Sequence, residues 1–352
     1  MSKIISGIQQ IGIGTPNEEK AFEWYKNHFG MDIRVFQDEA EASLMARYTG
    51  NKVQKRSATL AMNLQGGGGV EVWQYTSRNT EAPSFDIKVG DLGVFGTRIK
   101  CKNLRNTFDA LKSKGAQVIT DIVYDPHGEP YFFVKDPHGL VFQMVDGHSW
   151  FSNGKHHSGG IAGCMIGVSN VEKSLDLYMD ILEYDKIEYD ETGKFENLSY
   201  LDGGSQKFRR ILLGHSQPRK GSFSQLLGPS KIELIQALDR KPRKIFGDRY
   251  WGDMGFIHLC FDVRGMDQLK QECQKRGYEF KVDSKDSFDM GEAAGRFSYI
   301  EDPDGTLIEF VETHKLPIWK KVGWYLNIEN KPPEKPIPKW MLQFLRLNRV
   351  RD

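Results

Sequence analysis

Hydrophobic and polar positions along the chain follow one pattern that recurs four times. Its first occurrence opens with a strand-like run of apolar and polar residues at 8–13. Apolar residues then recur at helical spacing from Ala21 to Phe29, with Asn17 as an N-cap and Gly30 as a stop signal. Further strand patterns follow near residues 34–37, 57–63 and 70–75. The pattern therefore predicts a βαβββ module.

The same order of elements follows in modules near residues 94–145, 161–235 and 256–311. Single residues recur in register: Asn17, Lys20 and Tyr25 reappear, each 153 positions further on, as Asn170, Lys173 and Tyr178. Glu71, Gly96 and Gly115 correspond in position to Glu233, His258 and Gly277, each 162 residues further on. Registered repeats of this kind indicate a duplicated architecture. We interpret residues 1–150 and 158–315 as two domains, each a pair of modules, joined by a polar linker.

The tail, residues 316–352, does not belong to the repeat. It is rich in aromatic residues and proline, and its segment from Pro338 to Arg349 is expected to form a short helix. One interpretation is a strap that packs on the domain surface. The other is a lid over a binding site.

Composition narrows the class of protein. A chain of 352 residues with 39% hydrophobic residues can bury a core, and its length favours two domains. A net charge of +1 predicts no bulk attraction to nucleic acid or membrane. The four cysteines form no CxxC motif, which predicts reduced thiols. Since no segment resembles a signal peptide or a membrane span, we expect a soluble, cytoplasmic protein.

Three polar residues in apolar strands carry the candidate chemistry. Glu309, Glu233 and His258 each stand among hydrophobic neighbours, and a buried charge without a partner is costly. A histidine with two carboxylates suits one divalent ion of Zn, Fe, Mn, Ni or Co. The alternative is structural: a satisfied core histidine, and glutamates paired with arginines such as Arg209 or Arg210.

The repeated βαβββ units, the last closed by Asp302-Pro303-Asp304-Gly305 and a strand ending in Ile308-Glu309, resemble the vicinal oxygen chelate superfamily. Its members include glyoxalase I, methylmalonyl-CoA epimerase, bleomycin-resistance proteins, extradiol dioxygenases and hydroxyphenylpyruvate dioxygenase. The resemblance covers about 310 residues. It implies an α+β fold in which the four modules pair into two cupped mixed sheets, with metal ligands projecting inward.

This resemblance assigns four inward positions to each half of the chain. In the C-terminal half they fall on three polar residues and a glycine, namely Glu233, His258, Glu309 and Gly163. In the N-terminal half they fall on Gln10, Glu71, Gly96 and Gln143. We therefore expect the metal on His258, Glu309 and Glu233, and none in the N-terminal half. The vacant Gly163 position could be filled by water, by a substrate oxygen, or by a histidine from elsewhere: His215, His156 or His157.

The resemblance implies three functions. The first is a glyoxalase- or epimerase-like isomerase or lyase that acts on a small oxygenated substrate through an enediolate, with Glu233 as the candidate base. The alternative is a mononuclear Fe(II) dioxygenase, and the third is a non-catalytic small-molecule binding protein. Arg296, in the glycine-rich loop at 289–296, is a candidate anion partner for the substrate. Whether two chains pair as a homodimer stays open.

Overall fold

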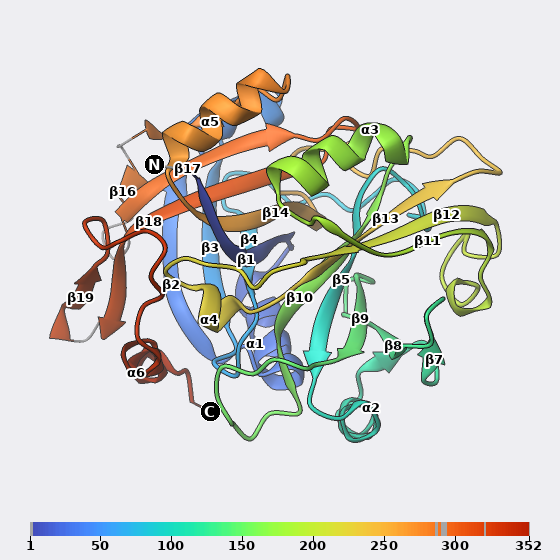
Figure 1. Ribbon diagram of the computed structural model, residues 1–352, viewed down its shortest axis with the longest axis horizontal. Helices are drawn as coiled ribbons and strands as arrows, with labels where there is room; N and C mark the ends of the chain where they lie inside the picture. The colour runs from blue at the N-terminus through green and yellow to red at the C-terminus, as the bar shows by residue number, and fades with distance from the viewer. Residues whose placement is uncertain (1–2, 286–287, 290–293, 320–321, 352) are drawn as a thin grey trace.

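Two curved mixed sheets form the protein (Figure 1). The computed structural model describes residues 3–285, 288–289, 294–319 and 322–351. In the order in which they lie side by side, the strands of the first sheet are β15 (Val282–Asp283), β17 (Ala294–Glu301), β18 (Leu307–Trp319), β14 (Gly255–Arg264), β1 (Ile4–Gly14), β4 (Gly69–Tyr75), β3 (Lys55–Met62) and β2 (Ile33–Glu41), with β16 (Phe288–Asp289) on β17 and β19 (Trp324–Asn327) on β18.

The second sheet has the same plan. Its strands are β11 (Lys186–Lys194), β12 (Lys207–Gly214), β13 (Lys231–Ala237), β10 (Ser158–Gly167), β5 (Gly93–Cys101), β9 (Val141–Asp146), β8 (Pro130–Lys135) and β6 (Gln117–Val118), with β7 (Val123–Tyr124) on β8. The predicted α+β fold, with four βαβββ modules paired into two cupped sheets, is therefore confirmed.

Short helices connect the strands. They are α1 (Glu18–Phe29), α2 (Leu104–Ser113), α3 (Val171–Leu175) with the π-helical turn η2 (Asp176–Ile181), α4 (Ser224–Leu227), α5 (Met266–Lys275) and α6 (Lys339–Leu342), with 3-10 turns η1 (Ser43–Tyr48), η3 (Glu196–Leu198) and η6 (Gln343–Asn348). The N-cap predicted at Asn17 is present, because its side chain accepts a hydrogen bond from the Lys20 backbone N–H at 2.9 Å. Gly30 ends α1 in the left-handed conformation, which favours glycine.

One hydrophobic core joins the two sheets. Side chains of α1, α2, α3 and α5 meet the outward-facing residues of β1, β5, β10 and β14 in it. All four cysteines are buried and form no disulfide. The opposite, concave face of each sheet forms a cup. We call these the first cup and the second cup, after their sheets.

The pairing of modules differs from the prediction. We expected neighbouring modules to pair, within 1–150 and within 158–315. Instead β1 of the first module pairs with β14 of the fourth, and β5 of the second pairs with β10 of the third. In Figure 1 the dark-blue β1 accordingly lies in the same sheet as the orange and red strands of the chain's end.

Side-chain volume at the junctions explains this pairing. Gly12 lies opposite His258, whose ring occupies the space above it. In the second sheet Met165 covers Gly96 in the same way. Since Met165 is the repeat counterpart of Gly12, pairing of neighbouring modules would set His258 against Met165 and glycine against glycine. The first arrangement would bring two large side chains into a clash, and the second would leave a void between two glycines. Close packing disfavours both.

The tail crosses the open side of the first cup. Strand β18 continues to Trp319 and turns back through β19. The last turn then reaches β2, where the Val350 backbone N–H donates to the Asp32 carbonyl oxygen at 2.9 Å. Leu342 and Leu345 are buried on the way. The tail therefore ties the two ends of the first sheet together, as a strap does.

Candidate metal centre

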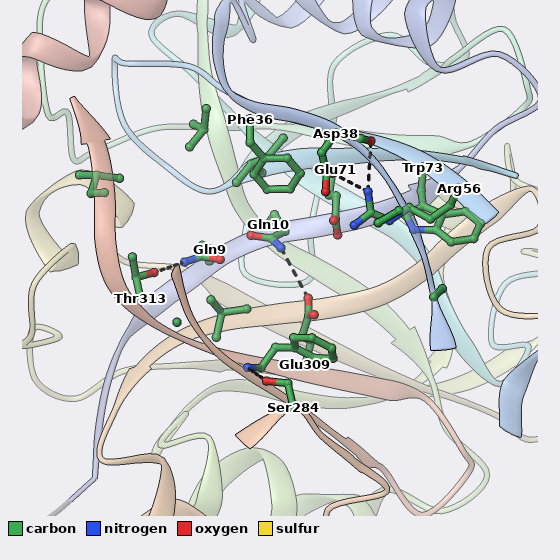
Figure 2. Close-up of a pocket in the computed structure, with 18 of the residues that line it drawn as sticks. Gln9, Gln10, Phe36, Asp38, Arg56, Glu71, Trp73, Ser284, Glu309 and Thr313 are labelled. Carbon is green, nitrogen blue, oxygen red and sulfur yellow. Dashed lines mark hydrogen bonds and ion pairs between the residues drawn. The ribbon is translucent and has the colours of Figure 1, made fainter. Parts of the chain in front are cut away.

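Four polar side chains meet at the middle of the first cup. They come from four adjacent strands: Glu309 from β18, His258 from β14, Gln10 from β1 and Glu71 from β4. Alternation along each strand sends their apolar neighbours to the core and these side chains into the cup. Figure 2 shows Gln10 and Glu309 pointing toward one another, with Glu71 above them. Two modules from opposite ends of the chain therefore build this site.

The nitrogen and oxygen atoms converge closely. His258 Nε2 lies 3.2 Å from Glu71 Oε2 and 3.1 Å from Glu309 Oε2. One ligand atom from each of the three residues lies within 4.8 Å of the others. Gln10 Nε2 donates to Glu309 Oε2 at 3.5 Å. Among the described residues, buried His258 Nε2 has no hydrogen-bond partner despite these close oxygens, and neither has Gln10 Oε1.

These orphaned atoms fit a metal ion. A buried nitrogen that faces two carboxylate oxygens without an aligned hydrogen bond has the position expected of a metal ligand. One imidazole nitrogen with carboxylate and amide oxygens is a donor set for Zn, Fe, Mn, Co or Ni. The residues present therefore fit a divalent cation.

Burial and charge shift the pKa values of this group in different directions. Burial raises the pKa of Glu309, and the neighbouring charge of Glu71 raises it further against the opposing effect of His258. Burial also acts to raise the pKa of Glu71, but the adjacent imidazole of His258, with the charge of Arg56, brings it below its usual value. The pKa of His258 is raised, since both carboxylates outweigh the effect of burial. The two carboxyls therefore differ in basicity.

Aromatic side chains hold the imidazole in place. The Tyr299 hydroxyl lies 3.5 Å from His258 Nδ1, and its ring meets the imidazole edge-on at 5.6 Å between centroids. Trp251 stacks on the other side at 6.3 Å. Gly12 leaves the room that the ring needs, because a Cβ there would lie 2.6 Å from Nε2. The ring is therefore fixed with Nε2 toward the carboxylates.

A cavity of about 440 Å³ opens onto Gln10, Glu71 and Glu309. Most of its wall is apolar, from residues that include Phe36, Leu60, Trp73, Phe223, Leu227, Trp251 and Phe297. The tail contributes Leu316, Pro317 and Leu345. Arg56 also lines the cavity, but its guanidinium is 2.5 Å from the carboxylate of Asp38 (Figure 2). The cavity therefore offers a small molecule an apolar surface next to the polar centre.

The structure brings together only part of the predicted ligand set. His258 and Glu309 meet as expected, but Glu233 lies in the second cup. There Arg210 Nε donates to Glu233 Oε1 at 2.6 Å, and the Tyr189 hydroxyl donates to the same oxygen at 2.9 Å. The structural alternative, a glutamate paired with Arg210, therefore describes Glu233. Its assignment as ligand and base is corrected, because modules three and four do not share a sheet.

Glu71 and Gln10 take the places that the sequence interpretation gave to Glu233 and Gly163. Both were assigned to a half without metal, since we expected neighbouring modules to pair. The signal that could have found them is the complementarity of Gly12 with His258 and of Gly96 with Met165. The proposed replacements for a ligand at Gly163 are elsewhere as well. His156 binds Asp32, His215 lines a cavity of the second cup, and His157 is exposed.

The candidate substrate residue Arg296 is engaged elsewhere. Its guanidinium binds Asp283 at 2.9 Å and Asp267 at 2.7 Å, and it is not among the described residues that line the cavity. The middle of its glycine-rich loop, 290–293, lies outside the described residues. Nothing in the described part of the chain therefore supports Arg296 as a substrate ligand.

Comparisons with known proteins agree with this fold. The family model described as Glyoxalase/Bleomycin resistance protein/Dioxygenase superfamily matches residues 7–144 and 160–310. Glyoxalase I from Zea mays is similar in structure, with a TM-score of 0.54 and 12% identity over 88% of this chain and 92% of that chain. A Bacillus subtilis subsp. subtilis protein, provisionally described as a dioxygenase, is similar at a TM-score of 0.54 and 17% identity, over 88% and 86% of the two chains.

At such low identity these two structures bear on the fold alone. No curated protein matches the sequence. Among the described residues, no helix is both long and apolar enough to cross a membrane.

Proposed function

Because the chain belongs to the Glyoxalase/Bleomycin resistance protein/Dioxygenase superfamily, we propose that it is a metal-dependent enzyme with its centre in the first cup. Glu71, His258 and Glu309 would hold one divalent cation, with the Gln10 amide oxygen as a further ligand. The reaction we propose is of the isomerase or lyase type, on a small oxygenated substrate. It moves a proton on a carbon next to a carbonyl group.

One observation carries this proposal: His258 Nε2 faces two carboxylate oxygens at 3.1 and 3.2 Å without an aligned hydrogen bond, at the floor of a cavity. A structural histidine would use that nitrogen in a hydrogen bond. A ligand nitrogen would keep it free for a cation. The second cup differs, because there Glu233 is paired with Arg210 and accepts a hydrogen bond from the Tyr189 hydroxyl.

The residues divide the chemistry between them. A bound divalent cation supplies Lewis-acid stabilisation of negative charge on adjacent substrate oxygens. Glu309 is the carboxyl we assign to proton transfer, since burial raises its pKa toward the range in which a general base works. Glu71, whose pKa is lowered, stays ionised. The apolar wall and the tail line the space beside the centre in which the reacting carbon would lie.

The cavity indicates what kind of substrate fits. Its wall beside the centre is built of aromatic and aliphatic side chains, and its guanidinium, from Arg56, is bound to Asp38. We therefore propose a substrate with two adjacent oxygens on an apolar, aromatic-sized body. Among the described residues, the other cation of the lining is Lys315, whose Nζ lies 4.1 Å from the Tyr325 ring centroid. A substrate with several carboxylates would find little else to neutralise them.

Deuterium exchange tests the proposal. 2-Hydroxyacetophenone carries adjacent oxygens, an aromatic ring and an exchangeable C–H bond, and NMR in D2O follows its exchange. We expect exchange with protein loaded with Zn, Mn, Ni or Co. The Glu309→Gln variant should lose about 100-fold or more, the range that general-base catalysis contributes. Glu233→Gln is the matched control and should keep the wild-type rate.

Equal exchange with and without metal would overturn the isomerase or lyase assignment, as would a fully active Glu309→Gln variant. Oxygen consumption by iron-loaded protein would instead favour the dioxygenase alternative. Binding without either reaction would favour the non-catalytic binder.

A further inference from the structure

The second cup contains a cavity of its own, about 620 Å³ in volume. It lies over β5, β10 and β13, and the segments at 146–149 and 214–219 help to enclose it. Its position repeats that of the first cup, but the polar groups are different. Arg98 and Lys100, two residues apart on β5, both face it.

Both cations are buried and lack a neutralising carboxylate. Arg98 is 7% exposed and Lys100 5%. Among the described residues neither has a carboxylate within 4.0 Å, and Arg98 has no hydrogen-bond partner. Lys100 Nζ donates to the Ser149 carbonyl oxygen at 2.7 Å and lies 5.0 Å from the Trp150 ring centroid. Two buried positive charges without a counter-ion are costly, and a bound anion would offset that cost.

The acidic residues around this cavity are already engaged or exposed. Glu188 binds Lys186 at 3.0 Å and lies 3.7 Å from Lys231. Asp125 accepts backbone N–H groups of its own turn. Glu129 and Asp146 are exposed at the rim. None of these carboxylates therefore neutralises the two buried cations.

The second cup has room for the Arg98 side chain because glycines replace two of the candidate metal ligands of the first cup. Gly163 stands where the first cup has Gln10, and the Arg98 side chain passes over it, with Cδ 3.1 Å from where a Cβ of residue 163 would lie. Met165 covers Gly96, the counterpart of His258. Duplication has therefore left one cup with converging carboxylates and the other with converging cations.

We propose that the second cup binds a small hydroxylated anion, whose carboxylate or phosphate group lies between Arg98 and Lys100. Arg98 supplies a guanidinium fork to two oxygens of the anion, and Lys100 supplies a point charge. Side chains of Ser149, Gln217 and Gln225 line the same cavity and can meet hydroxyl groups. This site is separate from the metal centre and does not depend on the reaction proposed there.

Isothermal titration calorimetry on the full chain tests the site with two probes, glycerol phosphate and glycerate, which share a vicinal diol and carry a phosphate and a carboxylate group, respectively. We expect one equivalent to bind, and the tighter probe identifies the group. Arg98→Gln and Lys100→Gln should each weaken binding about tenfold or more, the effect of losing a charge-assisted hydrogen bond. Exposed Lys194→Gln is the matched control and should bind as wild type does.

Binding of neither probe at millimolar concentration would overturn the proposal, as would undiminished binding by both variants. Circular dichroism and thermal unfolding, measured on the same samples, report whether each variant is folded. If Arg98→Gln does not fold, Lys100→Gln and Arg98→Lys decide: the first should bind weakly, and the second, which keeps the charge but loses the fork, should bind more weakly than wild type. A loss common to Lys194→Gln would show surface attraction only and contradict the site.

Discussion

At the scale of the residue, one glycine decides whether a histidine can reach the metal centre. Gly12 and Gly96 hold equivalent places at the two junctions between modules: each lies beneath a side chain of the partner strand. Above Gly12 this side chain is the ring of His258, held by Tyr299 and Trp251. Above Gly96 it is the flexible end of Met165. An added methyl group should therefore displace a rigid ring in the first cup but only a flexible side-chain end in the second.

We predict that Gly12→Ala lowers metal affinity about tenfold or more, although it removes no ligand. The new Cβ would lie 2.6 Å from His258 Nε2 and must displace the rigid ring. Titration with Zn or Mn measures the affinity. Gly96→Ala is the matched control, since the Met165 Cε that it meets can move aside. Equal affinity of both variants would show that the ring position is not set by Gly12.

Asp262 gives the first sheet a dependence of stability on pH. The residue is buried on β14, and burial raises the pKa of its carboxyl to about 7, far above its usual range. The folded state then binds the proton more tightly than the unfolded state does. The stability that this protonation provides is complete below about pH 4 and is lost as the pH rises toward 7.

We predict that Asp262→Asn raises the free energy of unfolding at pH 8, by up to about 4 kcal/mol if the whole shift is recovered. At acid pH the gain should disappear, because the wild-type carboxyl is then neutral as well. Urea denaturation between pH 4 and pH 8 measures both. Asp121→Asn, at an exposed position, should show no such trend. A constant difference at all pH values would contradict this account of Asp262.

At the scale of the element, the turns that close two modules bind helices of the other sheet. The Tyr25 hydroxyl, on α1, donates to Asp136 at 2.7 Å, and the Tyr178 hydroxyl, on η2, donates to Asp302 at 2.9 Å. Each pair links modules that are neighbours in sequence but lie in different sheets. The repeat of tyrosine and aspartate therefore encodes the contact between the sheets.

We predict that Tyr178→Phe lowers the free energy of unfolding by about 1–3 kcal/mol, because the buried Oδ2 of Asp302 loses the hydroxyl that donates to it. Tyr25→Phe should cost a similar amount. Thermal or urea unfolding measures both, with Tyr200→Phe, at an exposed position, as the control. If both variants are as stable as the control, these bonds do not hold the sheets together.

The sequence predicted the elements well, because local signals determine them. Helical periodicity, the N-cap at Asn17 and the repeated turns are readable without tertiary structure, and the structure has them. The pairing of modules was wrong, since the first strand of any module can pair with that of any other. The partner module is selected only by how well the side chains fit across the junction between first strands, as the ring of His258 fits over Gly12. That error transferred Glu233 into the predicted site and kept Glu71 out of it.

At the scale of the whole molecule, the duplicated chain folds so that its two ends meet. Modules one and four form the first cup, modules two and three form the second, and the tail ties β18 to β2 across the first. The candidate metal centre therefore requires both ends of the chain. The inward positions of the two cups differ: in the second cup Glu233 is paired with Arg210, and Gly163 has no side chain.

Metal content per chain tests the central claim, that the first cup alone holds one divalent cation. Protein purified without chelator, supplied with Zn, Mn, Fe, Co or Ni and then dialysed, is measured by elemental analysis, as wild type and as the His258→Ala and Glu233→Gln variants. The account predicts about one equivalent of metal in wild type and Glu233→Gln, and loss of most of it in His258→Ala. Equal metal content in wild type and His258→Ala, or loss in Glu233→Gln alone, would contradict it.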